Sequence, residues 1–189
     1  MLLTHDELIV LVREGVIQNC DTSQVNAASI DITLGNSIWY ENLDSNRDVV
    51  DLANKITPSM SYWDITDNVF DIEPGGFVLA SSREVFSLPN NIAAEYKLKS
   101  SLARSGLDHL NAGWADPGWH GSVLTLELNN VLQRHTLRLR PGMKIGQMVF
   151  FRGETVPDHA SYAVRVSYNG DTPNEEPGWN NPLQSLRGL

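Results

Sequence analysis

The sequence predicts a mainly β protein, folded as a sandwich or barrel and preceded by one short helix. Most of the chain consists of short runs rich in valine, isoleucine, threonine and aromatic residues, separated by Gly/Pro turns. A strand–helix alternation of about 30 residues is absent, which argues against a doubly wound α/β fold. With 189 residues, the chain fits one domain and needs neither a disulfide nor a metal to fold.

The predicted helix lies near the N-terminus. Thr4 and Glu7 form a capping-box pattern that marks its start. Leu8, Leu11 and Val12 then recur at helical spacing, and Gly15 is a stop signal. One apolar stripe of this kind predicts a helix packed on the domain for a structural purpose.

The strands are expected at residues 29–35, 37–42, 75–82, 93–99, 121–130, 135–140 and 144–151. Turns are expected at residues 74–76, 88–91, 116–118 and 140–142, which are rich in proline, glycine and asparagine. In the run 121–130, alternation places Leu124, Leu126 and Leu128 on one face, which we expect to join the core.

The chain is expected to divide into a single domain, residues 1–166, and a tail, residues 167–189. From residue 169 onward the tail is polar and contains three prolines and three glycines. Its composition allows two interpretations: a disordered extension, or an arm that becomes ordered on a ligand or a neighbouring subunit.

Composition narrows the class of partner. Cys20 is the only cysteine, so no intrachain disulfide can form, and a cytoplasmic location is expected. The formal net charge of −9 disfavours nucleic acid, whose phosphates need basic residues. No apolar run approaches the roughly 20 residues of a membrane span. A small anionic ligand remains possible, because a few local cations suffice to bind it.

Common catalytic signatures are missing from the sequence. It contains no phosphate-binding loop, no dinucleotide fingerprint, no nucleophile elbow and no zinc-deaminase signature. The five histidines do not show metal-ligand spacing. Any chemistry is therefore expected to use carboxylates and bound water.

Glu127 and Asp116 are the candidate carboxylates. Alternation places Glu127 opposite the leucine face, either as a solvated residue or as a general base whose pKa is raised by partial burial. Asp116 precedes Pro117-Gly118, so it either begins a β-turn or takes part in chemistry. Trp114 and Trp119 flank it and offer flat faces for a base or sugar, although tryptophans are also common in cores.

The segment Lys99–Gly106, KSSLARSG, is the candidate anion site. Two serine hydroxyls, one ammonium group and one guanidinium group within this segment are able to surround an anion. The alternative is a polar loop with ordinary surface charge.

Taken together, LKSSLARSGL, AGWADPGW, LTLELNN and LRPGMKIGQMVFF, in this order, resemble the dCTP deaminase family, a relative of the trimeric dUTPases. The resemblance extends from the first helix to Phe151. It implies a distorted β-barrel of the dUTPase (jelly-roll) type, a homotrimer and active sites between subunits. The implied reaction is the zinc-independent hydrolysis of dCTP to dUTP and ammonia, in pyrimidine deoxynucleotide metabolism.

The resemblance also implies roles for individual residues. Glu127 matches the glutamate that handles protons for the attacking water, and Ser100 and Arg104 match residues that position water and base. Asp116 matches an aspartate near the deoxyribose. The residues implied to bind substrate are Lys99, Ser101, Ala112, Gly113, Trp114, Trp119, Gln147 and Tyr168. Lys99 and Ser101 lie on the triphosphate side, and magnesium is expected through the nucleotide phosphates, without metal ligands from the chain.

Two departures keep alternatives open. The tail has Ser167 and Asp171 where the family commonly has lysine and glutamine, so a substrate with fewer phosphates, such as dCMP, or a modified cytosine is possible. Ala112-Gly113 followed by an aromatic residue and Asp116 is the form seen in bifunctional members, which continue to dUMP and pyrophosphate. The rival hypotheses are a dUTPase without deaminase activity and a non-catalytic nucleotide-binding or structural trimer.

Overall fold

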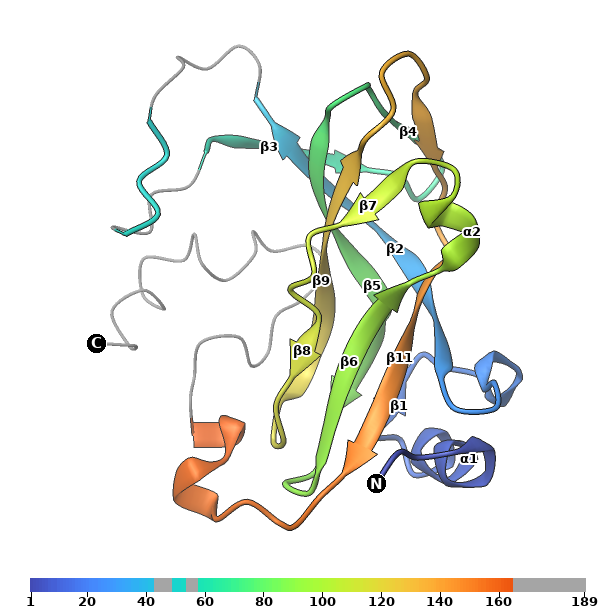
Figure 1. The fold of residues 1–189 in the computed structure, drawn as a ribbon, viewed down its shortest axis with the longest axis vertical. Coiled ribbons are helices and arrows are strands. Elements are labelled where there is room, and N and C mark those ends of the chain that lie inside the picture. Colours follow the sequence, from blue (N-terminus) through green and yellow to red (C-terminus); the bar gives the residue numbers. More distant parts are fainter. Residues whose placement is uncertain (43–48, 54–57, 165–189) are drawn as a thin grey trace.

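The computed structural model describes residues 1–42, 49–53 and 58–164. Within these residues the protein is mainly β, with one curled sheet that forms a half-barrel and an N-terminal helix packed at one end (Figure 1). The predicted fold class is therefore confirmed. The predicted tail, residues 167–189, lies outside the described residues, and so does Tyr168.

Helix α1 (His5–Arg13) forms as the capping pattern predicts. The backbone N–H of Thr4 donates to the Glu7 carboxylate at 3.2 Å. Leu8 and Leu11 are buried, and Gly15, with a φ of 74°, follows the end of the helix. Glycine adopts this left-handed conformation without the steric cost of a Cβ atom, which explains the stop. No helix among the described residues is long and apolar enough to span a bilayer.

The strands are β1 (Ile17–Gln18), β2 (Ile30–Glu41), β3 (Met60–Asp64), β4 (Phe70–Ile72), β5 (Phe77–Ser87), β6 (Ile92–Leu98), β7 (Leu107–His109), β8 (Trp114–Ala115), β9 (His120–Asn130), β10 (Leu137–Leu139) and β11 (Lys144–Arg152). The remaining elements are the short helix α2 (Ser100–Ala103) and the 3-10 turns η1 (Thr22–Gln24), η2 (Asp158–Ala160) and η3 (Tyr162–Val164). Each long strand coincides with a predicted run, except that the two runs at 29–35 and 37–42 form one strand, β2.

The main sheet has the order β7-β9-β5-β2-β11-β6-β8, with β1 added to β5 and β3 added to β2. Strands β10 and β4 pair separately. The curl of the sheet brings its two ends close together. The ring of Tyr96 on β6, next to one end of the sheet, lies 4.6 Å, centroid to centroid, from that of His109 on β7 at the other end. Residues that are far apart in strand order thus become neighbours inside the curl.

The two faces of β9 are both covered. Leu124, Leu126 and Leu128 lie in the core, as alternation predicts. On the opposite face Val123 is also buried, and Leu79, which pairs with Glu127 across β5 and β9, is 1% exposed. The face that carries Glu127 is therefore not an ordinary solvent-facing surface.

Candidate active site

Glu127 is partly buried in the middle of β9. Its side chain is 18% exposed. This exposure is far below that of a solvated strand glutamate, so the sequence alternative of a simple surface residue is wrong. A carboxylate in such a position is able to exchange protons with a bound molecule while most bulk water is kept away.

His109 is a close polar neighbour of Glu127. Strand β7 pairs with β9 and brings the His109 Nε2 atom to 3.3 Å from Glu127 Oε2. The backbone N–H of Asn111 donates to His109 Nδ1 at 3.2 Å. Since Nδ1 accepts a hydrogen bond, neutral His109 carries its proton on Nε2, facing the carboxylate. The sequence did not identify His109, because β-pairing and not spacing along the chain creates this contact.

Tyr96 completes a small polar cluster with His109 and Glu127. Burial, followed by the charge of Glu127, raises the pKa of the Tyr96 hydroxyl, so the phenol stays protonated. Tyr96 Oη, His109 Nε2 and Glu127 Oε2 are buried, and none makes a hydrogen bond to the described residues. Unsatisfied buried polar atoms are costly and rare, and they are common where a ligand binds. The cluster is therefore suited to holding a polar group of a substrate.

Two glycines make room for Tyr96. A Cβ atom at Gly146 would lie 2.1–2.3 Å from the Tyr96 ring and hydroxyl. A Cβ atom at Gly113 would lie 2.8 Å from Tyr96 Cβ and 3.0 Å from its carbonyl oxygen. Gly113 also accepts a hydrogen bond from the Tyr96 N–H at 2.8 Å. Gly113, which is predicted to line the substrate site, thus packs closely against Tyr96, and so does Gly146, which the sequence did not single out.

Replacing Gly146 by alanine is expected to lower the free energy of unfolding by about 1–3 kcal/mol, because the new methyl group overlaps the buried Tyr96 ring. Gly153→Ala is the matched control, since a Cβ atom there has no neighbour within 4 Å. Urea denaturation of both variants measures the difference. Equal stability of the two variants would contradict the close packing of Gly146 against Tyr96.

Asp116 lies in the predicted turn and also receives a side-chain hydrogen bond. The N–H of Trp119 donates to the Asp116 carbonyl at 3.2 Å, which closes the turn, and Gly118 has a φ of 89°. The indole Nε1–H of Trp114 donates to Asp116 Oδ1 at 3.0 Å. Both sequence interpretations of Asp116 are therefore compatible with the structure, since its backbone forms the turn and its carboxylate is oriented by a neighbour.

The two tryptophans differ in exposure. Trp114 is 58% exposed and stacks against Phe151 with ring centroids 6.3 Å apart. Trp119 is 7% exposed and stacks on Phe86 at 5.5 Å. The Trp119 ring belongs to the core, and its predicted role in substrate binding stays a prediction. Trp114 is the ring available for contact.

The segment KSSLARSG forms a surface turn with one anchored residue. Ser100, Ser101 and Arg104 are exposed on and just after α2. Lys99, in contrast, donates from Nζ to Asp31 Oδ1 at 2.5 Å. The structure thus gathers the predicted residues in two places, Glu127 in the cluster with His109 and Tyr96, and Lys99 in a second group around Asp31.

Two further predicted residues border these places. Gln147, on β11, pairs in register with Asp31 and accepts a hydrogen bond from Ser29 Oγ at 3.3 Å. Ala112 is exposed in the loop between β7 and β8. The position of Gln147 links it to the group around Lys99, whereas Ala112 lies in the loop that follows His109.

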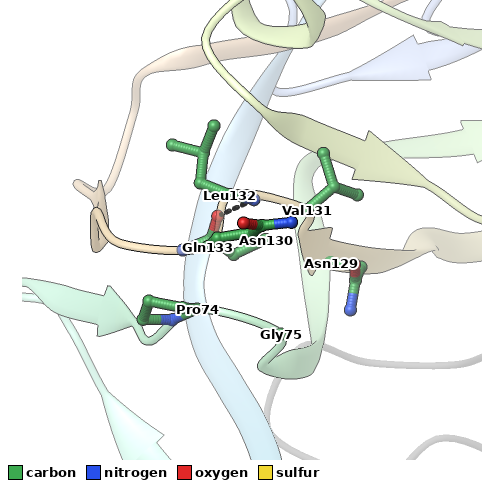
Figure 2. A pocket seen from close by; sticks show the side chains of 7 residues that line it. All are labelled: Pro74, Gly75, Asn129, Asn130, Val131, Leu132 and Gln133. Atoms are coloured by element: carbon green, nitrogen blue, oxygen red, sulfur yellow. Dashed lines mark hydrogen bonds between the residues drawn. The ribbon is translucent and has the colours of Figure 1, made fainter.

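A hollow of about 560 Å³ at the end of β9 is a separate feature (Figure 2). It is lined by Pro74, Gly75 and residues 129–133. The buried Asn130 amide donates to the carbonyls of Ile72 and His135 at 2.8 Å each, and its Oδ1 accepts from the Leu132 N–H at 3.0 Å. The Asn130 side chain therefore acts as a structural brace of the turn, and Glu127 does not line the hollow.

Comparison with known proteins supports the resemblance found in the sequence. Residues 2–153 match a family model described as dCTP deaminase-like. The chain is 37% identical over 187 residues to a "dCTP deaminase, dUMP-forming" of Nocardioides sp., covering 92% of this chain and 94% of the relative. It is 43% identical over 136 residues to a protein of the same description from Methanoregula boonei, covering 71% and 72% of the two chains.

A solved structure gives an independent comparison of the fold. The crystal structure of 2'-deoxycytidine 5'-triphosphate deaminase from Agrobacterium tumefaciens superposes with a TM-score of 0.63 at 22% identity. The match covers 80% of this chain but only 48% of that chain, so this chain spans about half its length. At this identity the match supports the shared fold alone.

Proposed function

The chain belongs to the dCTP deaminase-like family, and from this premise we propose that it hydrolyses dCTP to dUTP and ammonia without zinc and then cleaves dUTP to dUMP and pyrophosphate. The observation that carries the proposal is the partly buried Glu127 beside His109 and Tyr96. The dUMP-forming description of the relatives supports the second step.

Deamination needs one group that moves a proton twice. Water adds to C4 of cytosine as Glu127 accepts its proton, which gives a tetrahedral centre. The bond between C4 and the amino nitrogen then breaks as the same carboxyl group delivers the proton to departing ammonia. General acid–base catalysis of this kind contributes roughly 10²–10⁴-fold, so positioning of water and base must supply the rest.

His109 acts as a positioning residue in this proposal. Its Nε2–H faces Glu127 Oε2 at 3.3 Å, and the Asn111 N–H holds the ring in that tautomer. A small rotation of the His109 ring would turn this approach into a hydrogen bond, which would select one orientation of the Glu127 carboxylate. The other Glu127 oxygen would then face the water.

Asp116 is proposed to serve the second reaction. Its carboxylate would accept a proton from a water that attacks the α-phosphorus of dUTP, and the bond to the bridging oxygen would break to release pyrophosphate. The indole of Trp114 holds one carboxylate oxygen at 3.0 Å, which leaves the other for water. A dUTPase alone would use this aspartate but would leave Glu127 without a function.

The exposed residues of α2 support a shared site in a homotrimer. Ser100, Ser101 and Arg104 lie at the surface of a single chain. There they are able to contact a nucleotide that is also bound by a neighbouring subunit. Magnesium would arrive as part of the nucleotide. Asp31, the carboxylate beside Lys99, already accepts bonds from two lysines, which makes this carboxylate a poor metal ligand and supports cations as the groups that would meet the phosphates. The single cysteine, Cys20, supports a cytoplasmic location.

Incubation with magnesium and dCTP, dCMP or dUTP, followed by chromatography, tests the function. We expect dCTP to yield ammonia, dUMP and pyrophosphate in equal amounts, with activity retained after removal of zinc. Turnover of dUTP alone would support a dUTPase, and turnover of dCMP alone a substrate with fewer phosphates. The absence of any turnover would favour the non-catalytic alternative, and a monomeric mass in light scattering would contradict the shared site.

A further inference from the structure

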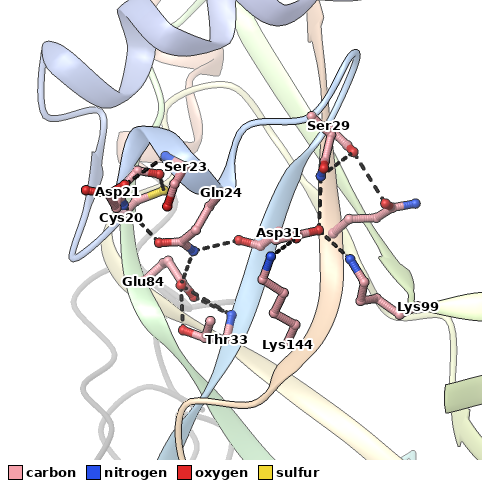
Figure 3. Close-up of polar contacts among 12 residues, drawn as sticks. Cys20, Asp21, Ser23, Gln24, Ser29, Asp31, Thr33, Glu84, Lys99 and Lys144 are labelled. Atoms are coloured by element: carbon pink, nitrogen blue, oxygen red, sulfur yellow. Dashed lines mark hydrogen bonds and ion pairs between the residues drawn. The ribbon is translucent and has the colours of Figure 1, made fainter. Parts of the chain in front are cut away.

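Asp31 of β2 lies between two lysines, Lys99, which directly follows β6, and Lys144 of β11 (Figure 3). Lys99 Nζ lies 2.5 Å from Asp31 Oδ1, and Lys144 Nζ lies 2.8 Å from Oδ2. The Asp31 side chain is 4% exposed, whereas those of Lys99 and Lys144 are 27% and 54% exposed. We call these three residues the Asp31 triad. It has a buried anion at its base and two ammonium groups nearer the surface.

The backbone holds the triad together. The N–H of Lys99 donates to the carbonyl of Ile145 at 3.3 Å, beside Lys144. Strand β11 pairs with β2 on its other side, where Gln147 lies opposite Asp31. Asp31 and Lys144 are therefore held in paired strands, and Lys99 is held by its backbone hydrogen bond to β11, so the three residues are positioned before any ligand binds.

The Asp31 triad carries a net positive charge. Burial alone would raise the pKa of Asp31, but hydrogen bonds from Lys144, Lys99 and Asn26 outweigh it and lower the pKa, so the carboxyl group is ionised. Asn26 Nδ2 supplies the third bond, at 3.0 Å to Oδ1. One carboxylate against two ammonium groups leaves a charge of about +1 at neutral pH.

One lysine would suffice to neutralise Asp31. The second adds repulsion between two ammonium groups that share one carboxylate, and an anion placed across them would relieve it. Each ammonium group has three N–H donors, and its bond to Asp31 uses one of them. The remaining donors belong to partly exposed groups, which is the arrangement that binds an anion with charge-assisted hydrogen bonds.

We propose that Lys144 is a phosphate-binding residue, that it acts with Lys99 on the polyphosphate of the nucleotide, and that Asp31 positions both ammonium groups. The substrate class, a nucleoside polyphosphate, rests on the proposed function. The site itself is defined by the geometry of the Asp31 triad. Lys144 is absent from the phosphate-binding residues expected from the sequence, because it lies in β11, 38 positions after the end of the KSSLARSG segment.

Binding of inorganic tripolyphosphate, measured by calorimetry, tests the site without catalysis. Lys144→Met is expected to weaken binding by about 10-fold or more, the loss of one charge-assisted contact. Lys97→Met is the matched control, because Lys97 is 53% exposed on β6 and pairs with Glu95 instead. We expect the control and Lys144→Arg to bind nearly as the wild type does. The KM for dCTP should rise in Lys144→Met with little change in kcat.

The outcomes separate the site from the function. Equal tripolyphosphate affinity in Lys144→Met and wild type, or no binding by the wild type, would show that the Asp31 triad is only a structural brace, even if dCTP is turned over. Binding that depends on Lys144 in a protein that turns over no nucleotide would support the site and contradict the proposed function. Thermal unfolding of each variant shows whether a weakened affinity reflects loss of the fold.

Discussion

Glu127→Gln is expected to reduce deamination of dCTP by about 10²–10⁴-fold or more while the protein remains folded. Glutamine has nearly the same shape as glutamate, so it fills the space beside His109, but it cannot accept a proton from water and return it to ammonia. Release of ammonia from dCTP, measured under single-turnover conditions, gives the rate. Nucleotide binding should change much less than the rate, because the amide still offers hydrogen bonds.

Glu95→Gln is the matched control for this prediction. It makes the same chemical change on β6, where Glu95 pairs with Lys97 and its side chain is 34% exposed. We expect this variant to deaminate dCTP as the wild type does. Retained deamination in Glu127→Gln would refute Glu127 as the proton carrier. Loss of deamination with intact cleavage of dUTP would show that the two reactions use different carboxylates.

Trp119→Ala is expected to lower the free energy of unfolding by about 3–5 kcal/mol. The ring is 7% exposed and stacks on Phe86, so its removal leaves a cavity in the core and loses an aromatic contact. Losses of this size are a large part of the total stability of a domain. Urea denaturation, monitored by circular dichroism, measures the effect.

Trp114→Ala provides the comparison, because Trp114 is 58% exposed and only five positions away in the same segment. Its loss removes the hydrogen bond to Asp116 and the stacking of an exposed ring against Phe151. We expect the free energy of unfolding to fall by less than about 1.5 kcal/mol. Equal destabilisation by the two substitutions would contradict the assignment of Trp119 to the core. Trp114→Ala should instead affect cleavage of dUTP, since it frees the Asp116 carboxylate.

Several features could be predicted because local patterns decide them. The capping residues Thr4 and Glu7 and the stop at Gly15 act within one or two turns, so they determine α1 without the rest of the chain. Alternation in β9 assigns Leu126 and Leu128 to the core, and it assigns Glu127 to the other face. The short strands β1, β7 and β8 were missed, because two or three residues are too few to show alternation.

The sequence by itself thus determined the fold class, the long strands and the candidate carboxylates, together with a family resemblance that the comparisons confirm. Only the tertiary structure decided which residues meet: His109 with Glu127, Tyr96 with Gly146, and Lys144 with Asp31. It also decided which tryptophan is buried. The physical reason is that a period of two tells which face of a strand a residue occupies, whereas its neighbours depend on register and on the curl of the sheet, which join segments distant in sequence.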